Sequence, residues 1–296
     1  MQERNTSPKS SFGTYLILVL TAAIWGFAFV AQRKGMEYID PLLFNGIRFA
    51  LGAFFLAMVR RVWTLKIIKD TWQLGVVLFV AASFQQYGMI WTTAGNAGFI
   101  TGLYVVFVPL IGIYRGQKLS RITWVSILLA LGGLYLLSNR QSIDINFGNA
   151  LVLISALFWA LHVQYIDKFA KKHEAFELAL GQFAVCAILS LSFGIAIRAI
   201  ENPLFLFGAA FYRPLFPAIL PILYGGILSV GVAYSLQVYA QQKSQPTIAA
   251  LILCSESLFA LFGGWLILGE SISLMMLLGA GLLLMAMLLN LFMGDR

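Results

Sequence analysis

Residues 15–31 read YLILVLTAAIWGFAFVA, a run of seventeen positions without a charged side chain. As an α-helix, rising about 1.5 Å per residue, this run crosses most of the roughly 30 Å hydrocarbon core of a bilayer. Comparable apolar runs recur at 42–59, 72–91, 94–114, 123–137, 148–166, 175–197, 216–239, 247–268 and 273–292. The sequence therefore predicts an all-α, polytopic membrane protein with ten transmembrane helices.

The composition excludes a water-soluble protein. Of the 296 residues, 60% are apolar and 11% are charged, with a mean hydropathy of +0.86, whereas a soluble domain carries roughly a quarter of its residues charged. The net charge of +8 does not indicate a nucleic-acid partner, because the basic residues form short clusters between apolar runs. The lipid bilayer is the expected surrounding.

The basic residues also predict the orientation. With the amino terminus inside, the inside segments hold fourteen Lys and Arg and the outside segments hold five. Since Lys and Arg concentrate in cytoplasmic connections, we expect a multi-pass protein of the inner (plasma) membrane with both termini in the cytoplasm. The five outside residues are Arg33, Lys34, Arg140, Arg198 and Arg213.

The two halves of the chain resemble each other. A shift of 134 residues superposes Trp25 on Trp159 and gives six identities in about 35 positions, and a shift of 153 superposes Gly116 on Gly269. We therefore expect two five-helix repeats, at residues 1–140 and 147–293. An odd number of helices per repeat inverts the second copy, an arrangement that serves alternating access in transporters. The alternative is a duplication kept for packing alone.

Three stretches resemble a known family. AAIWGFAFVAQ at 22–32, NAGFITGLYVVFVPLIG at 96–112 and LCSESLFALFGGWLILGE at 253–270 are similar to the drug/metabolite transporter (DMT) superfamily, EamA type. The resemblance implies ten helices in two inverted repeats, a cavity lined by helices 1, 3, 4, 6, 8 and 9, and efflux of small metabolites, amino acids or toxic organic compounds. Ser257, in place of a frequent Pro, and Arg115-Gly116-Gln117, in place of a common Gly-Glu, depart from the family pattern.

Polar and aromatic residues at helical spacing predict the lining of this cavity, because polar groups in hydrocarbon are costly unless they face the bundle interior. Such residues share one face of a helix at i, i+3, i+4 and i+7. The alternative for each aromatic residue is ordinary packing or lipid contact, and for His162 a packed, hydrogen-bonded role. The candidates for substrate binding are Trp25, Gln86, Tyr87, Tyr104, Trp159, His162, Tyr234 and Gln237.

Glu256 is the one carboxylate deep inside an expected span. It lies about 13 Å deep, too far for its short side chain to reach the surface, so it must be paired, wetted or protonated. One hypothesis is a proton-coupling or cation-binding site. The other is a structural acid, hydrogen-bonded to Ser255, Ser257 or a neighbouring helix.

Two further charged residues have plainer interpretations. Arg48 lies about six residues from the outer end of its helix, so we expect it to reach the interface as a lipid anchor or to serve in helix packing. Glu270 lies at the turn into the last helix and can complement a helix amino terminus. Neither is expected to bind substrate.

The sequence lacks the features that an enzyme or a nucleotide-driven pump would need. An enzyme would need paired carboxylates or His at ligand spacing, no phosphate-binding glycine loop is present, and neither a metal nor a cofactor is expected. A secondary transporter of small organic solutes, acting as monomer or homodimer and with possible proton coupling, fits best. The alternative is a non-transporting receptor or scaffold, which would usually carry a sizeable loop or tail.

Overall fold

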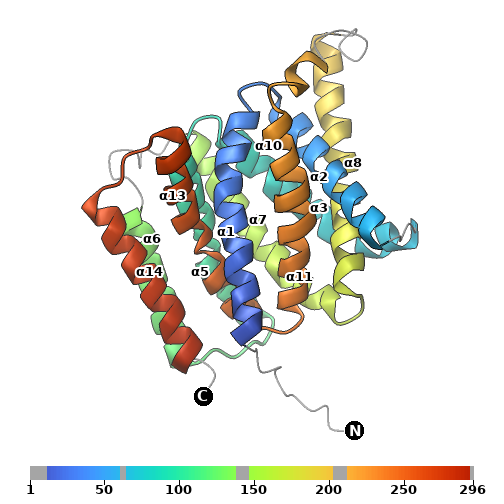
Figure 1. Ribbon diagram of the computed structural model, residues 1–296. Helices are drawn as coiled ribbons and strands as arrows, with labels where there is room; N and C mark the ends of the chain where they lie inside the picture. Colours follow the sequence, from blue (N-terminus) through green and yellow to red (C-terminus); the bar gives the residue numbers. More distant parts are fainter. Residues whose placement is uncertain (1–11, 61–64, 138–146, 203–211, 294–296) are drawn as a thin grey trace.

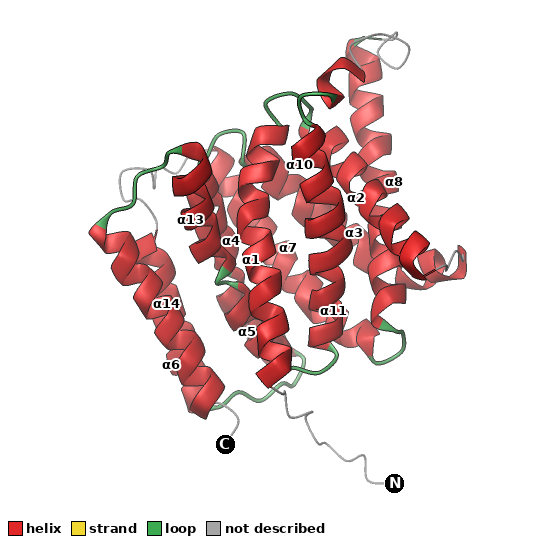
Figure 2. Cartoon of the chain, viewed as in Figure 1, coloured by secondary structure: helices red, strands yellow, loops and turns green. Residues whose placement is uncertain are grey.

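The computed structural model describes residues 12–60, 65–137, 147–202 and 212–293. These residues form helices joined by turns, with no strand among them (Figure 2). The expected all-α class is confirmed for this part of the chain. Its cause is the solvent: in hydrocarbon each backbone N–H and C=O needs a partner, and a helix supplies these within one segment.

The helices divide into two successive groups, one on each side of the residues between 137 and 147. The first group is α1 (Phe12–Gly35), α2 (Pro41–Arg60), α3 (Leu65–Gly88), α4 (Ala94–Gly102), α5 (Tyr104–Tyr114) and α6 (Arg121–Leu137). The second is α7 (Phe147–Ala170), α8 (Ala175–Glu201), the 3-10 turn η3 (Arg213–Leu215), α10 (Ile219–Leu223), the π-helix η4 (Tyr224–Tyr234), α11 (Ser235–Gln241), α12 (Pro246–Leu253), α13 (Glu256–Leu268) and α14 (Leu274–Met293).

Nine helical stretches in the described residues are long and apolar enough to cross a membrane. Three of them, Ala94–Tyr114, Ile219–Gln241 and Pro246–Leu268, combine shorter elements. The tenth expected span is α6, which has 17 residues and is about 26 Å long, at the lower limit for a transmembrane helix. It packs lengthwise against α14 on one side of the bundle (Figure 1).

The chain is arranged as a bundle in which α1 begins and α14 ends at the same end (Figure 1). We call this the terminal end and the opposite one the far end. The α6–α14 pair lies on one side of the bundle, and α2 packs against α8. Between them α1, α7 and the segments from α10 to α13 form the centre.

Glycines allow the α6–α14 pair to pack backbone against backbone. A Cβ on Gly133 would lie 2.8 Å from the Gly279 carbonyl oxygen, and one on Gly279 would lie 2.6 Å from that of Gly133. Gly98 and Gly102 of α4 are similarly covered, by Ala260 and Leu134. Small residues here bring helices close within one chain, as expected for membrane bundles.

Three expected spans are interrupted near their middles. In 94–114 the helix breaks at Leu103, and in 247–268 it breaks at Cys254 and Ser255. Short i to i−3 bonds tighten both places: Leu103 N–H donates to Ile100 at 3.2 Å and Ser255 N–H to Ile252 at 3.1 Å. The Ser255 hydroxyl also donates to the Ile252 carbonyl, at 2.7 Å, a bond that bends helices. The third span contains the π-helix η4.

Candidate functional site

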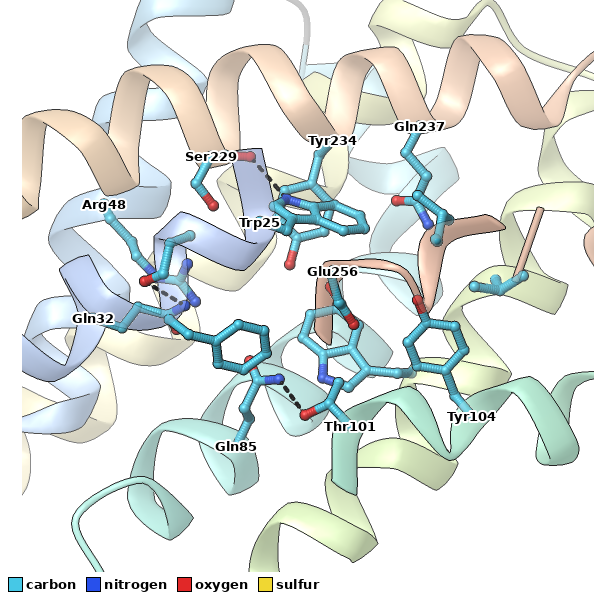
Figure 3. A pocket seen from close by; sticks show the side chains of 15 residues that line it. Trp25, Gln32, Arg48, Gln85, Thr101, Tyr104, Ser229, Tyr234, Gln237 and Glu256 are labelled. Atoms are coloured by element: carbon cyan, nitrogen blue, oxygen red, sulfur yellow. Dashed lines mark hydrogen bonds between the residues drawn. The ribbon is translucent and has the colours of Figure 1, made fainter. Parts of the chain in front are cut away.

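The interrupted helices meet around a cavity in the centre of the bundle (Figure 3). Side chains from α1, α2, α3, α4, α5, α7, η4, α11, α12 and α13 line it. Its volume is about 40 Å³, enough for a few water molecules, since one water needs roughly 10–15 Å³. The described conformation is therefore nearly closed around its central site.

Three aromatic side chains form one wall. The Trp25 and Tyr234 ring centroids lie 4.6 Å apart, and those of Trp159 and Tyr234 lie 6.1 Å apart. The Trp25 indole N–H donates to the Ser229 carbonyl at 3.2 Å, which fixes its ring against the π-helix. Trp25 and Trp159, equivalent under the 134-residue shift, thus both line the cavity.

Several buried polar atoms of the lining have no hydrogen-bond partner within the described part of the protein. Buried polar groups are nearly always paired, so atoms left open on a cavity wall are positioned for a solute or for water. Five such atoms line the cavity, and four of them belong to residues that the sequence selected. Those four are Tyr104 Oη, Trp159 Nε1, Gln237 Oε1 and Glu256 Oε1, and the fifth is Gln32 Oε1.

Glu256 is the first residue of α13 and directly follows the break at Ser255. Its side chain points into the cavity, between the aromatic wall and Tyr104 (Figure 3). The two serines proposed as structural partners are used elsewhere: Ser255 donates to Ile252, and Ser257 donates to the Gly98 carbonyl at 2.8 Å. The neighbour of this carboxyl on another helix is the Tyr104 hydroxyl of α5. Neither serine hydroxyl donates to this carboxylate in the structure.

On α3 a neighbouring residue takes the place expected for Gln86 and Tyr87. Gln85 lines the cavity and its side chain donates to the Thr101 hydroxyl at 2.9 Å. Gln86 is buried outside the lining, and Tyr87 lies in an apolar groove beside Trp91. Successive helical residues point about 100° apart, so choosing the stripe through Gln86 turned the expected face away from the cavity.

His162 lies behind the aromatic wall and not on the cavity surface. Its Nε2 is 2.6 Å from Gln182 Oε1, and its ring stands edge-on to Trp159, with centroids 5.7 Å apart. This is the packed, hydrogen-bonded role held open as its alternative. We infer that His162 supports Trp159 and Tyr234 and does not itself touch a solute.

Of the two roles expected for Arg48, the interfacial anchor is wrong, and the side chain lies among packed helices. Its side chain is 2% exposed and lines the cavity. Nε donates to Asn45 Oδ1 at 2.9 Å, and the guanidinium carbon lies 4.7 Å from the centroid of the Phe49 ring. The sequence argument considered only depth. The helical face shared with the buried Asn45, at i−3, was the signal that could have placed Arg48 inside.

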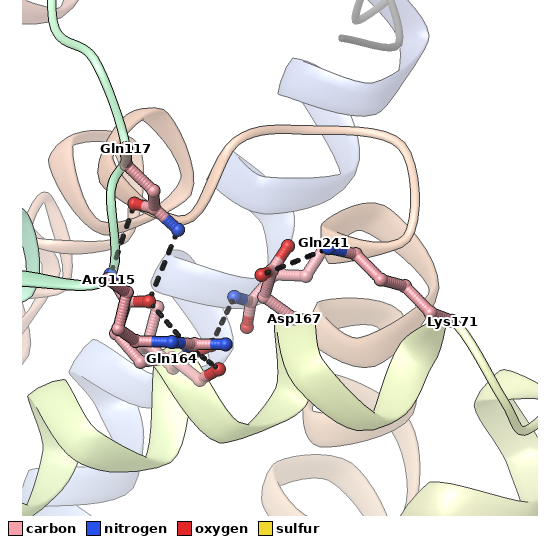
Figure 4. A network of polar contacts seen from close by, with 7 residues as sticks. Arg115, Gln117, Gln164, Asp167, Lys171 and Gln241 are labelled. Atoms are coloured by element: carbon pink, nitrogen blue, oxygen red, sulfur yellow. Dashed lines mark hydrogen bonds and ion pairs between the residues drawn. The ribbon is translucent and has the colours of Figure 1, made fainter. Parts of the chain in front are cut away.

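A polar network joins the end of α5 to α7 and α11 at the terminal end (Figure 4). Arg115, just after α5, donates to both the backbone and side-chain oxygens of Gln164 on α7. Gln164 Nε2 donates to the Val108 carbonyl at 2.8 Å, and Gln241 of α11 donates to Val163 at 3.2 Å. The Arg115-Gly116-Gln117 departure from the family pattern thus supplies helix-to-helix contacts.

Glu270 lies at the far end, outside the spans, where it faces the start of α4. Burial raises the pKa of Glu270 above its ordinary value, while hydrogen bonds from the Ala94 and Gly95 backbones and the charge of Arg33 oppose that rise. The carboxylate does complement a helix amino terminus, but it is that of α4. Sequence proximity had pointed to the following helix, α14.

The described residues contain no group of three or more His, Cys, Asp or Glu that could hold a metal ion. Cys186 and Cys254 are buried free thiols. The polar atoms of the cavity are hydroxyl, amide, indole, carboxylate and guanidinium groups. Such a set suits hydrogen bonding and ion pairing with an organic solute.

The matching family model and the sequence relatives are those of transporters. The model of the EamA-like transporter family matches residues 13–139 and again 146–292. An uncharacterized transporter of Archaeoglobus fulgidus is 30% identical over 92% of this chain and 83% of its own. The uncharacterized transporter YoaV of Bacillus subtilis is 25% identical over 94% and 97%. The uncharacterized inner membrane transporter YedA of Escherichia coli is 24% identical over 94% and 89%.

One solved crystal structure has the same fold. It superposes with a TM-score of 0.77 over 97% of this chain and 99% of its own, at 16% sequence identity. A likeness at that identity concerns the arrangement of helices alone. The relatives and this structure all match over nearly the whole chain, so the resemblance is not confined to a single helix or half.

Proposed function

The chain belongs to the EamA-like transporter family, and from this premise we propose that it is a secondary transporter that exports small organic solutes by alternating access. Metabolites, amino acids and drug-like amphiphiles are the candidate substrates. The family is one of transporters and not of enzymes. The helices and the relatives make the chain a multi-pass membrane protein.

The observation that carries the proposal is the set of open polar atoms on an aromatic cavity wall at the middle of the bundle. Tyr104, Trp159, Gln237 and Glu256 each leave one such atom without a protein partner in the described residues. Broken helices at mid-membrane are typical of transporter binding sites. A solute could supply the missing hydrogen bonds while its apolar part contacts the rings.

Internal symmetry supports two inverted repeats, which we place at residues 1–140 and 147–293. Gly116 and Gly269, 153 residues apart, are the two glycines with positive φ in the described chain, at +82° and +70°. They follow α5 and α13, which begin just after the breaks at Leu103 and Ser255. The family model matches the two halves separately.

The packing of helices supports the same symmetry. If α1 corresponds to α7, and α3 to the segment α10–α11, then the contact of α3 with α7 corresponds to that of α1 with η4 and α11. The self-related pairs α2–α8 and α6–α14 also pack together. Exchanging the conformations of two such halves would open the cavity to the other side of the membrane.

A cavity of about 40 Å³ is too small for an organic solute, so transport requires the bundle to open at one end. The polar network at the terminal end closes that side. We place the terminal end in the cytoplasm, on the evidence of the Lys and Arg distribution and of α1 and α14 meeting at one end of the bundle (Figure 1). A relative named as an inner membrane transporter supports the same membrane.

Glu256 is our candidate for energy coupling. A carboxylate in the membrane interior is expensive to leave charged and unpaired. Its Oε1 faces the cavity and makes no ion pair or close hydrogen bond in the described chain, with the Tyr104 hydroxyl as its neighbour. Binding a proton or a cationic group would relieve that cost. Exchange of a proton for a solute at this carboxylate would link the two movements.

The experiment that tests the proposal is a flux assay in proteoliposomes. Purified protein is reconstituted, and counterflow of amino acids, aromatic acids, nucleosides and organic cations is measured with and without a pH gradient. Protein-dependent counterflow of one class of solute is the expected result. Binding of a solute without any counterflow would instead support the alternative, a membrane receptor or scaffold.

A further inference from the structure

Arg48 is a cation in the membrane interior without a carboxylate beside it. Its side chain is 2% exposed, and none of the ion pairs in the described residues involves it. A guanidinium stays protonated in proteins and has five N–H donors. An unpaired charge buried in this way is costly, so the position calls for an anionic partner.

The protein satisfies only part of that guanidinium. Nε donates to Asn45, which is itself held by a bond from its Nδ2 to the Ala82 carbonyl at 3.1 Å. The terminal Nη groups have no hydrogen-bond partner in the described chain, while the side chain lines the cavity. One edge of the guanidinium is therefore fixed by the protein, and the fork of Nη donors remains for a ligand.

The position of Arg48 separates it from Glu256. Figure 3 shows Arg48 beside Gln32 at one side of the cavity and Glu256 beside Tyr104 further along it. Gln32 adds a buried side-chain oxygen without a protein partner in the described residues, which can accept a hydrogen bond from a donor group of a solute but cannot bind its anionic group. The repeat-equivalent of Arg48 is the neutral Gln182, whose oxygen bonds His162. Among the described residues of the lining, the one cation thus comes from the first half, and the site is asymmetric in charge.

We propose that Arg48 binds an anionic group of the transported solute, so that substrates are organic acids or zwitterions with a carboxylate-like group and an apolar or aromatic body. This inference rests on the proposed transport function and adds a substrate class to it. Planar carboxylates match the guanidinium fork with two parallel hydrogen bonds. The rings of Trp25 and Tyr234 provide the surface for the body of the solute.

The test compares ligands that share a skeleton and differ in one group. Phenylacetate, phenylacetamide and phenethylamine, and the indole series indoleacetate, indoleacetamide and tryptamine, are titrated into purified protein by isothermal calorimetry. We expect at least one acid to bind at least about tenfold more tightly than its amide and amine, the factor expected for a charge-assisted pair. Equal binding of an amide, or no binding of either acid, would overturn the proposal.

Variants locate the effect. Arg48→Gln should weaken acid binding at least about tenfold and leave amide binding unchanged, while Arg48→Lys, which keeps the charge and loses the fork, should fall between. Arg121→Gln removes a cation from the exposed start of α6 and should change nothing. Should Arg48→Gln fail to fold, the ligand series measured on the native protein and on Arg48→Lys still tests whether Arg48 binds the anionic group.

Failure here is distinguishable from failure of the transport function. If the proteoliposome screen finds counterflow of a neutral or purely cationic solute and none of acids, the proposal of an anion site at Arg48 is wrong, while the proposed transport function is supported. If calorimetry finds binding of acids that depends on Arg48 and the screen finds no counterflow of any solute, the anion site is supported and the proposed transport function is wrong.

Discussion

Arg115 and Gln164 are joined by two hydrogen bonds: Arg115 Nη1 donates to the Gln164 backbone oxygen at 2.7 Å and to its Oε1 at 2.8 Å. Arg115 follows α5 and Gln164 lies on α7, so the pair ties two helices of the cavity wall together at the terminal end (Figure 4). An opening that separates α5 from α7 would break both bonds.

Removing the Gln164 side chain should loosen the terminal end. In Gln164→Ala the bonds to Oε1 and from Nε2 are lost, and a charge-assisted bond of about 1.5–3 kcal/mol is among them. We expect backbone amides at the end of α5 to exchange hydrogen at least about tenfold faster. Lys171→Ala, which removes an exposed partner of Asp167 on the same helix, is the control. Unchanged exchange in Gln164→Ala would show that the network does not hold this end closed.

Neutralising Glu256 should uncouple transport from protons. Glu256→Gln keeps the shape of the side chain and removes its proton exchange, so a pH gradient should no longer drive solute accumulation in proteoliposomes. Solute counterflow without a gradient should persist. Glu270→Gln, which alters a carboxylate at the far end, is the control. Full pH-driven accumulation by Glu256→Gln would leave the carboxylate with a structural role.

Two adjacent glycines of α6 should respond oppositely to alanine. The Cβ in Gly133→Ala would meet the Gly279 backbone at 2.8 Å, and backbone cannot move aside as a side chain can. Overpacking of this kind costs about 1–3 kcal/mol. Gly132 has nothing within 4 Å of its Cβ position, so Gly132→Ala should gain up to about 1 kcal/mol from helix propensity. Thermal unfolding in detergent measures both, and equal melting temperatures would argue against the tight α6–α14 contact.

The aromatic wall should determine solute affinity. Trp25→Ala removes the ring that lies 4.6 Å from Tyr234 and should weaken solute binding about tenfold, since an aromatic contact and its buried area are both lost. Trp25→Phe should keep part of it. Trp265→Ala changes a Trp that is 48% exposed on the bundle surface and should bind normally. Equal affinity of Trp25→Ala and the native protein in calorimetry would remove Trp25 from the site.

Helical periodicity predicted much of the cavity because the two tryptophans sit on faces that also carry polar residues. Trp25, Trp159, Tyr104, Tyr234, Gln237 and Glu256 all line it in the structure. The same reasoning chose Gln86 where the structure has Gln85. The periodicity of one helix does not tell which of its faces points toward the bundle interior. Choosing the neighbouring residue rotates the expected face by about 100°.

Arg48 shows a second limit of predicting the site from the sequence. Its depth from the end of α2 was readable in the sequence and suggested a side chain that reaches the interface or packs between helices. Which way that side chain points depends on α2 packing against α8 and η4, contacts between segments more than a hundred residues apart. The inward orientation, and with it the proposed anion site, follows from that packing.

By itself the sequence determined that the chain lies in a lipid bilayer and that its segments are α-helices. Apolar runs of bilayer length must pair their own backbone N–H and C=O groups, and a helix does this within one segment. It also shows similarities between the two halves, such as Gly116 and Gly269, from which we expect two repeats. The tertiary structure decided where the helices break, that α5 is tied to α7 through Arg115, and which polar side chains share one cavity. Those features depend on how the apolar surfaces of the helices pack together. Hydrophobicity alone does not favour one packing arrangement over another, because lipid is as apolar as the helices themselves.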